Sequence, residues 1–344
     1  MTHRIQKLFP LLFSLLIIIS CQLPTLSAPT IIPSTPSFTS TFTETPTQTA
    51  TPLPTETATP TETPALTPTP THHASRVLIL SIDGLRPDAI YAAPMPNLIA
   101  LMQTSAYTLN AQTIHPSVTL PSHASMLVGV CPSKHGVDWN DYLPERGYAQ
   151  GTDIFDLAHA AGLQTVMYVG KEKLIQLTEP SSVEIYRYIN DRDLVIADEL
   201  INNFPEDFGV LFVHFPLVDG MGHEYGWMSP EQLSVAFRAD EALGSVLGEL
   251  DARNLRDETL IIITADHGGH DTTHGSSMPV DMTIPWVASG PGIQPGALTT
   301  QVHTMDTAAT AAFVLDLPIP PEWDGVPVYE AFGLPVDRQS ASCE

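Results

Sequence analysis

The sequence predicts an α/β domain built on a mostly parallel central sheet with helices on both faces. Five short runs of apolar, mostly β-branched residues recur along the chain, which is typical of strands buried on both faces. Stretches with a helical pattern separate most of these runs. Acidic residues and histidines follow the runs in glycine-containing loops, where an open α/β sheet carries its active site.

The N-terminal residues 1–20 have the features of a secretion signal. Arg4 and Lys7 precede an apolar segment at 8–19, which is too short to span a bilayer comfortably. The segment leads into Cys21 through small and apolar residues, a pattern that resembles the lipobox of bacterial lipoproteins. We therefore expect a lipid anchor on Cys21 and a location at the bacterial cell surface or envelope. An ordinary signal peptide cut elsewhere is the alternative.

Residues 21–74 are rich in threonine and proline and almost free of large apolar side chains. Such a segment buries too little apolar surface to offset the entropy of ordering it. Because proline fixes φ and removes backbone donors, we expect an extended stalk that reaches on the order of 160 Å. Residues 75–337 then form one folded domain, and 338–344 form a short tail.

Within the folded domain, each predicted element follows from a local pattern. The predicted strands, all expected to be parallel, lie at 77–80, 165–169, 210–213, 260–263 and 284–287. The predicted helices lie at 96–102, 154–161, 191–203 and 230–250. The last of them begins with Ser229 as N-cap and Pro230 at the first helical position.

Charge and cysteine content limit the partners. The chain has 14 Lys and Arg against 38 Asp and Glu, a formal net charge of −24, so no nucleic acid polymer is expected as a partner. We expect metal ions to supply the positive charge that an anionic substrate requires, and the alternative source is a lysine such as Lys171 or Lys173 folded into the site. Cys131 and Cys343 are far apart in sequence and Cys343 lies in a polar tail, so we expect two free thiols rather than a disulfide.

Thr119 lies at the start of a predicted helix that has Pro121 in its first turn and continues to Val128. Free backbone N–H groups and the positive end of a helix dipole favour a bound phosphate at such a position. A threonine hydroxyl is a poor nucleophile at pH 7, but a divalent metal ion can stabilise its alkoxide. Taken alone, Thr119 is best interpreted as a simple N-cap, and only the metal-type ligands elsewhere in the chain favour a nucleophile.

Metal-type ligands follow three of the predicted strands. They are Asp83 after the first strand, Asp219 and His223 after the third, and Asp266 and His267 after the fourth. Mixed carboxylate and imidazole donors suit Zn²⁺ best, with Mn²⁺ or iron as alternatives. Any one pair alone is weak evidence for a metal, because turn or cap chemistry is then the favoured interpretation. Further along, GGHDTTHG offers two more histidines, His270 and His274.

The motifs and their order along the chain resemble those of the alkaline phosphatase superfamily, in particular its type I phosphodiesterase/nucleotide pyrophosphatase branch. The resemblance covers residues 76–332 and rests on SIDGLRPD, TLPSHASMLVGVCPSKHGV, DGMGHEYG, TADHGGH, THG and IPWVASGPGI. It implies an alkaline phosphatase-like catalytic domain with two divalent metal ions, zinc being the expected metal, and a small phosphoester substrate.

The resemblance also implies a role for individual residues. Thr119 would be the nucleophile and would bridge the two ions, while Asn140 would bind a phosphate oxygen. One ion would be held by Asp83, Asp266 and His267, and the other by Asp219, His223 and His274. His274 is preferred over His270 because the family places HG before an apolar strand and Gly-Pro-Gly. The nearby His123, His135 and His214 are expected to be packed, hydrogen-bonded histidines.

The chain also departs from related enzymes. His274 follows His267 by only seven residues, whereas many pyrophosphatase relatives carry a long insertion here. No arginine follows Thr119 directly, unlike in phosphatases that clamp monoester oxygens with one. We therefore predict a surface-anchored, metal-dependent phosphoric ester hydrolase that prefers diesters. A phosphomonoesterase or phosphonate hydrolase is the alternative, and a non-catalytic binding lipoprotein is a third hypothesis, although a binder has no need of a nucleophile at the metals.

Overall fold

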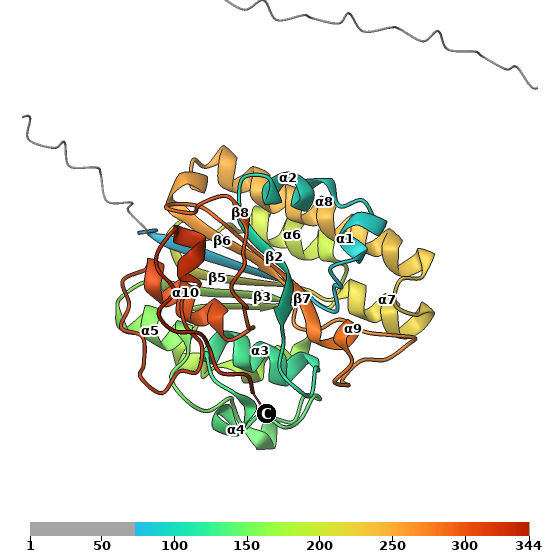
Figure 1. The fold of residues 1–344 in the computed structure, drawn as a ribbon, viewed down its shortest axis with the longest axis horizontal. Helices are drawn as coiled ribbons and strands as arrows, with labels where there is room; N and C mark the ends of the chain where they lie inside the picture. Colours follow the sequence, from blue (N-terminus) through green and yellow to red (C-terminus); the bar gives the residue numbers. More distant parts are fainter. Residues whose placement is uncertain (1–72, 344) are drawn as a thin grey trace, which may run out of the picture. The chain divides into compact units, whose positions relative to one another are not determined.

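The computed structural model describes residues 73–343. The predicted signal peptide, Cys21 and nearly all of the predicted stalk lie outside this range. The described residues form an eight-stranded sheet with the strand order β4-β3-β5-β1-β6-β7-β2-β8. Helices cover both of its faces (Figure 1), so the predicted fold class is confirmed.

The strands follow the apolar runs closely. Four of the predicted strands form β1 (Arg76–Ile82), β3 (Gln164–Val169), β5 (Phe208–Phe215) and β6 (Thr259–Thr264). They are parallel neighbours in the middle of the sheet, and β4 (Ile185–Tyr188) adds a further parallel strand at the edge beside β3. The sequence analysis did not identify β4, β2 (Ala106–Gln112) or β8 (Gly296–Ala297).

One strand runs against the expected direction. Residues 284–287 were expected to be parallel, but they belong to β7 (Thr283–Ser289), which pairs antiparallel with both β6 and β2. A parallel neighbour requires a crossover over one face of the sheet, usually through a helix. The segment between β6 and β7 contains only the short helix α9 (Pro279–Met282) and returns directly at the same edge. The prediction of a fifth parallel strand there was therefore wrong.

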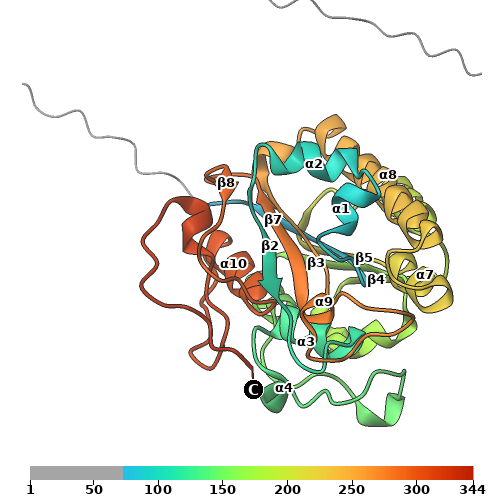
Figure 2. The same cartoon turned by 45° about the vertical axis from the view of Figure 1, so that its right-hand side comes forward.

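The helices form two layers, which both ribbon views show (Figures 1 and 2). One layer contains α1 (Ala89–Ala92), α2 (Pro96–Met102), α6 (Asp193–Asn202), α7 (Leu217–Tyr225) and α8 (Pro230–Ala252). The other contains α3 (Thr119–Val128), α4 (Pro132–His135), α5 (Ile154–Ala160) and α10 (Asp306–Val314). Short 3-10 turns lie at Pro144–Arg146, Glu172–Leu177 (η2), Pro180–Ser182, Arg256–Glu258 and Tyr329–Phe332. Within residues 73–343, no helix is both long and apolar enough to cross a membrane.

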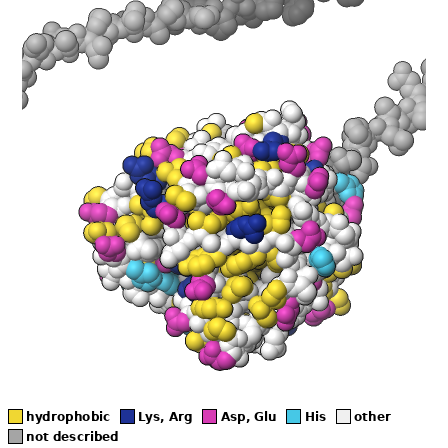
Figure 3. All heavy atoms as spheres, turned by 180° about the vertical axis from the view of Figure 1, so that it is seen from behind, with side chains coloured by type: hydrophobic (Ala, Val, Ile, Leu, Met, Phe, Trp, Pro, Cys, Tyr) yellow, Lys and Arg dark blue, Asp and Glu magenta, His cyan; other side chains and the backbone are white. Residues whose placement is uncertain are grey.

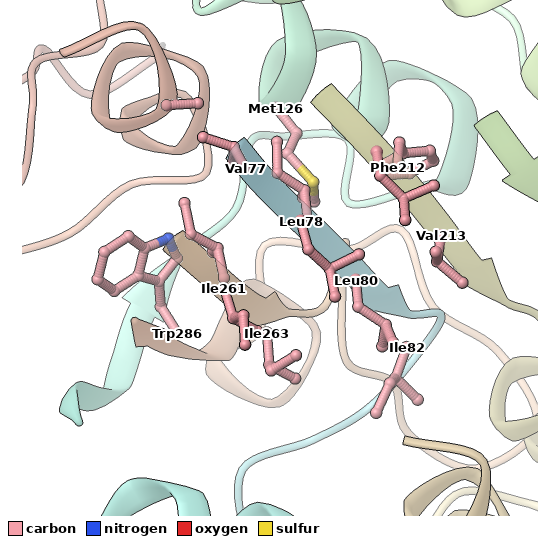
Figure 4. Close-up of a cluster of buried hydrophobic side chains, with 14 of the residues drawn as sticks. Val77, Leu78, Leu80, Ile82, Met126, Phe212, Val213, Ile261, Ile263 and Trp286 are labelled. Carbon is pink, nitrogen blue, oxygen red and sulfur yellow. The ribbon is translucent and has the colours of Figure 1, made fainter. Parts of the chain in front are cut away.

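The hydrophobic core lies on both faces of β1. Its side chains from Val77 to Ile82 are fully buried between β5 and β6, and Figure 4 shows Leu78 and Leu80 between Phe212 on one side and Ile261 on the other. Met126 reaches the same cluster from α3. Burial of each such apolar side chain contributes about 1.5–3 kcal/mol to the free energy of folding. This burial favours the position of β1 at the centre of the sheet.

The C-terminal segment is tied to the domain. Cys131 and Cys343 form a disulfide with a Cα–Cα distance of 5.4 Å, so the expectation of two free thiols was wrong. Hydrogen bonds bring the segment there: His303 Nδ1 donates to Ser340 Oγ at 2.7 Å, and that hydroxyl donates to Asp306 Oδ2 at 3.1 Å. The separation of 212 residues in sequence is closed by tertiary packing, which the cysteine spacing did not reveal.

The surface agrees with the acidic composition. Figure 3, which shows the molecule from behind, has Asp and Glu side chains scattered across the face among apolar and neutral groups. Many of the Lys and Arg side chains are paired with acids, as in the Arg86–Asp88 and Lys134–Asp324 ion pairs. This face offers no extended basic surface for a nucleic acid backbone.

Candidate active site

The strand register brings the predicted site residues to one edge of the sheet. Ile82 of β1 pairs with Phe215 of β5, and Ser81 pairs with Thr264 of β6. The residues that follow these parallel strands therefore emerge together, with Asp83 close to the start of α7 and to the loop after β6. This is the carboxyl edge, where α/β sheets carry their binding sites.

Thr119 is the first residue of α3. The N-cap is Val118, which has an extended backbone conformation and makes no side-chain cap bond, so a capping role for Thr119 does not apply. The Thr119 side chain is buried, and the next backbone amide, Leu120 N–H, donates to Asn140 Oδ1 at 2.9 Å. The structure thus places the predicted nucleophile and the predicted phosphate-binding amide together at one helix start.

The first candidate metal group consists of Asp83, Asp266 and His267, whose ligand atoms all lie within 4.8 Å of one another. The Asp266 Oδ1 atom accepts bonds from Gly84 N–H at 3.1 Å and from His267 N–H at 3.0 Å. His267 Nδ1 donates to Gly268 O at 2.8 Å, which leaves Nε2 as the ligand atom. One side-chain atom of each residue is buried without a hydrogen-bond partner. These atoms are Asp83 Oδ1, Asp266 Oδ2 and His267 Nε2. Unpaired buried groups are costly, and a cation would satisfy all three.

The second candidate group consists of Asp219, His223 and His274, again with ligand atoms within 4.8 Å of one another. Asp219 and His223 lie one turn apart on α7, so they share a face of the helix. Both histidine Nε2 atoms approach Asp219 Oδ1, at 3.4 Å from His223 and 3.6 Å from His274. Burial is the main cause that lowers the pKa of His274 to about 4, which keeps its ring neutral and able to bind a metal.

The donor atoms of both groups are of the kinds that bind divalent metal ions. Each offers carboxylate oxygen and imidazole nitrogen, a donor set that suits Zn²⁺ and related first-row metals. Each contains at least one buried ligand atom without a hydrogen-bond partner. The residues that the resemblance assigned to two separate ions are thus gathered into the same two groups by the structure.

His270 lies outside both groups. Its Nδ1 donates to Asp281 Oδ1 at 2.7 Å, and Asp281 Oδ2 accepts bonds from the backbone and hydroxyl of Ser276, at 2.9 and 2.7 Å. Asp281 is fully buried, so it fixes the loop on both sides of His274. His270 therefore supports the loop that carries the candidate ligand His274.

Three other histidines are buried and hydrogen-bonded, as expected. His214 accepts a bond from Gly170 N–H at 3.2 Å and donates through Nε2 to Asp83 Oδ2 at 2.8 Å. His123 donates through Nδ1 to Thr119 O at 2.9 Å, and burial is the main cause that lowers its pKa to about 4. His135 lies further away and donates through Nε2 to Ser125 Oγ at 2.9 Å. His214 and His123 thus orient the backbone and carboxylate of the site from behind.

Two lysines that the sequence offered only as an alternative source of positive charge lie in the site. Lys171 Nζ lies 2.7 Å from Asp83 Oδ2, 2.6 Å from Asp219 Oδ2 and 3.4 Å from Thr119 Oγ1. Lys173 Nζ donates to Asn140 Oδ1 at 3.0 Å. Burial alone would lower the pKa of Lys171, but the carboxylates of Asp83 and Asp219 raise it above its ordinary value.

The expectation that positive charge comes from metal ions rather than from side chains was therefore wrong, and the alternative named for Lys171 and Lys173 is confirmed. A local signal was present, because Lys171 and Lys173 lie two and four residues after Val169, the last residue of a predicted strand. At the carboxyl edge of a parallel sheet, residues in that position face the site.

The family described as "Type I phosphodiesterase / nucleotide pyrophosphatase" matches residues 77–290. The chain belongs to this family. The matched range contains both candidate metal groups, Thr119, Asn140 and both lysines. Among curated relatives, an uncharacterised pyrophosphatase/phosphodiesterase of Schizosaccharomyces pombe is 26% identical over 219 residues, which cover 56% of this chain and 44% of the relative.

A second relative has a different name and extends over more of the chain. The catalytic subunit of human GPI ethanolamine phosphate transferase 2 is 28% identical over 296 residues, covering 77% of this chain and 29% of the relative. The chain thus spans less than half the length of these two relatives.

Solved structures show the same fold. Murine ectonucleotide pyrophosphatase/phosphodiesterase 5 superposes with a TM-score of 0.63 at 16% identity, covering 75% of this chain and 99% of that one. The alkaline phosphatase PafA superposes with a TM-score of 0.63 at 15% identity, covering 76% and 99%. The domain therefore has the alkaline phosphatase-like fold.

Proposed function

We propose that this protein is a metal-dependent phosphoric ester hydrolase that uses Thr119 as its nucleophile at a two-zinc centre. One observation carries the proposal. A buried threonine hydroxyl at the start of α3 lies in the same site as two groups of ligand residues whose facing atoms lack hydrogen-bond partners. Membership of the phosphodiesterase family supports the same reaction class.

In the proposed reaction, Thr119 Oγ1 attacks phosphorus in line, and the ester oxygen leaves with its alcohol. The resulting phospho-threonine is then cleaved by water, which regenerates the hydroxyl and releases the phosphate product. Bound zinc ions would stabilise the deprotonated hydroxyl and neutralise charge on the phosphoryl oxygens. Asp83, Asp266 and His267 would hold one ion, and Asp219, His223 and His274 the other.

Asn140 has a defined part in this scheme. Its Oδ1 atom already accepts bonds from Leu120 N–H and from Lys173 Nζ, at 2.9 and 3.0 Å. These two bonds orient the side-chain amide, so its Nδ2 hydrogens are the groups available to a phosphoryl oxygen. We propose that Asn140 binds the substrate through Nδ2 while α3 supplies backbone donors beside it.

The family and the short segment between His267 and His274 favour a phosphodiester as the substrate. A relative from Xenopus laevis is named bis(5'-adenosyl)-triphosphatase. The second candidate is a phosphomonoesterase. Lys171 and Lys173 favour it, because a monoester dianion carries more charge and gains more from nearby ammonium groups.

We also propose a lipid-anchored protein of the bacterial surface or envelope. The pattern that ends at Cys21 supports this location. The disulfide between Cys131 and Cys343 supports it independently, since disulfides persist mainly in oxidising compartments outside the cytoplasm.

The hydrolase proposal is tested by metal removal and a pair of substrates. Chelation should abolish turnover of bis-p-nitrophenyl phosphate and p-nitrophenyl phosphate, and added Zn²⁺ should restore it. Elemental analysis of the active protein should find two ions per chain, as the two ligand groups require. A zinc-loaded, folded protein that cleaves neither ester would contradict the proposal and would favour a binding role.

A further inference from the structure

Lys171 links the two candidate metal groups. Its ammonium contacts one carboxylate of each group, Asp83 at 2.7 Å and Asp219 at 2.6 Å, and it does so through their Oδ2 atoms. The Oδ1 atoms of the same carboxylates have no hydrogen-bond partner and belong to the ligand sets. Each carboxylate therefore has one oxygen on the lysine and the other free for a cation.

The charge balance of the site makes this contact important. Asp83, Asp219 and Asp266 are all buried, and carboxylates that share a buried site repel one another. Within residues 73–343, Lys171 is the only lysine or arginine that forms an ion pair with any of these three carboxylates. Without this ammonium, the metal-free site would hold three buried acids with no Lys or Arg partner.

The position of Lys171 is fixed by the backbone before it. Gly170 N–H donates to His214 Nδ1 at 3.2 Å, and His214 Nε2 donates to Asp83 Oδ2 at 2.8 Å. A Cβ at Gly170 would lie 2.3 Å from the Pro216 ring, so β3 and the start of α7 approach too closely there for any side chain. The backbone before Lys171 is therefore held by contacts with His214 of β5 and with Pro216 at the start of α7.

We propose that Lys171 is the internal counter-ion of the metal centre. In the metal-free protein it neutralises Asp83 and Asp219 through Oδ2, and it holds the two ligand groups together before any ion binds. This inference rests on the proposed function only for the presence of the metals. It assigns Lys171 a positioning role toward Asp83 and Asp219, measurable by stability and metal affinity.

Two opposite effects follow from removal of the ammonium. The metal-free protein loses stability, because its buried carboxylates repel one another without compensation. Zinc binds more tightly, because the incoming cation no longer meets a fixed positive charge. Loss of Lys171 also leaves the Asp83 and Asp219 side chains less fixed, and ordering them opposes zinc binding. This entropy cost is smaller than the repulsion between Zn²⁺ and the ammonium at this distance, so the net result is tighter zinc binding.

The test compares wild type, Lys171→Met and Lys173→Met as full-length proteins. Lys173 is the matched control because it is a neighbouring lysine that contacts Asn140 rather than a carboxylate. Thermal unfolding is measured with chelator and with saturating Zn²⁺, and zinc affinity by competition with a chelating dye. Lys171→Met should unfold at a lower temperature than wild type only without metal. It should also bind zinc at least about tenfold more tightly. Lys173→Met should show neither effect.

Equal loss of stability with and without zinc, or unchanged or weaker zinc affinity, would overturn the proposal. If Lys171→Met folds only with zinc, the counter-ion role is supported. If it folds in neither condition, Lys171→Gln, which keeps the length and a polar end, takes its place with the same expected results. Hydrolysis by the wild type is assayed separately. Zinc binding without hydrolysis would contradict the proposed function alone, and active wild type with unchanged affinity in the variants would contradict this inference alone.

Discussion

The Nε2 atoms of His223 and His274 lie 3.1 Å apart, although 51 residues separate them in sequence. Each ring donates through Nδ1 to a backbone carbonyl, His223 to Thr272 O at 3.0 Å and His274 to Ser117 O at 2.8 Å. When each ring carries a single proton, both Nε2 atoms are acceptors, and two facing acceptors repel. A cation bound to both nitrogens would remove the repulsion, so this geometry supports the candidate metal site.

His274→Ala should therefore reduce the bound metal from two ions toward one, because it removes a ligand atom. His270→Ala is the matched variant, since His270 contacts Asp281 and belongs to neither group. It should retain both ions. Elemental analysis of the two purified variants checks the prediction, and greater metal loss in His270→Ala would reverse our assignment of the ligand.

Thr119→Ala should lower turnover by a factor on the order of 10³ or more, because no other hydroxyl is assigned to attack phosphorus. Folding and metal content should remain near wild type, since the ligand groups do not depend on this side chain for their hydrogen bonds. Thr119→Ser keeps a hydroxyl at the start of α3 and should remain active. Activity of the alanine variant within tenfold of wild type would exclude Thr119 as the nucleophile.

Diesters should be cleaved more efficiently than monoesters by the wild type, as kcat/KM for the bis-p-nitrophenyl and mono-p-nitrophenyl esters will show. Lys173→Ala should lower kcat/KM for the monoester about tenfold more than for the diester, because the dianion gains more from the ammonium. Equal losses would indicate that Lys173 only orients Asn140. A wild type that prefers the monoester would establish the second candidate function instead.

The stability of the protein should depend on pH through His135, which is distant from the metal groups. Val137 N–H donates to its Nδ1 at 3.1 Å, and burial is the main cause that lowers its pKa from 6.5 to about 4. As pH falls from 6.5 to about 4, His135 becomes protonated in the unfolded chain but stays neutral in the folded protein. Folding stability is therefore lost over this pH range. Above pH 6.5 this contribution is constant.

His135→Asn should remove that part of the pH dependence. The difference in unfolding free energy between wild type and variant should shrink by on the order of 2–3 kcal/mol from pH 7.5 to pH 4.5. Urea denaturation at both pH values measures it. A difference that stays constant would show that His135 has the same pKa in the folded and unfolded chains.

Cys21→Ser should release the protein from membranes without changing its specific activity. The lipobox-like pattern motivates the first expectation, and the predicted stalk between Cys21 and the folded domain motivates the second. Membrane fractionation with an activity assay on both fractions provides the measurement. If the serine variant stays with the membrane, the apolar segment at 8–19 anchors the chain uncleaved.

The local features of this protein could be predicted from its residue patterns. Apolar runs specified β1, β3, β5 and β6, because strands buried on both faces need continuous hydrophobic segments. The spacing of Asp219 and His223 allows both to face one ion, since residues four apart meet on one helical face. The choice of His274 over His270 came from the order of the motifs, not from any local pattern.

Other features arise only from contacts between segments that are distant in sequence. The direction of β7 was set by the connection after β6, and the Cys131–Cys343 bond was set by the packing of the C-terminal segment on α10. The register of β3 beside β5 brought Lys171 to the carboxylates of Asp83 and Asp219. Strand register and long-range packing are properties of the assembled sheet, and residue patterns within one segment do not encode which distant segment becomes its neighbour.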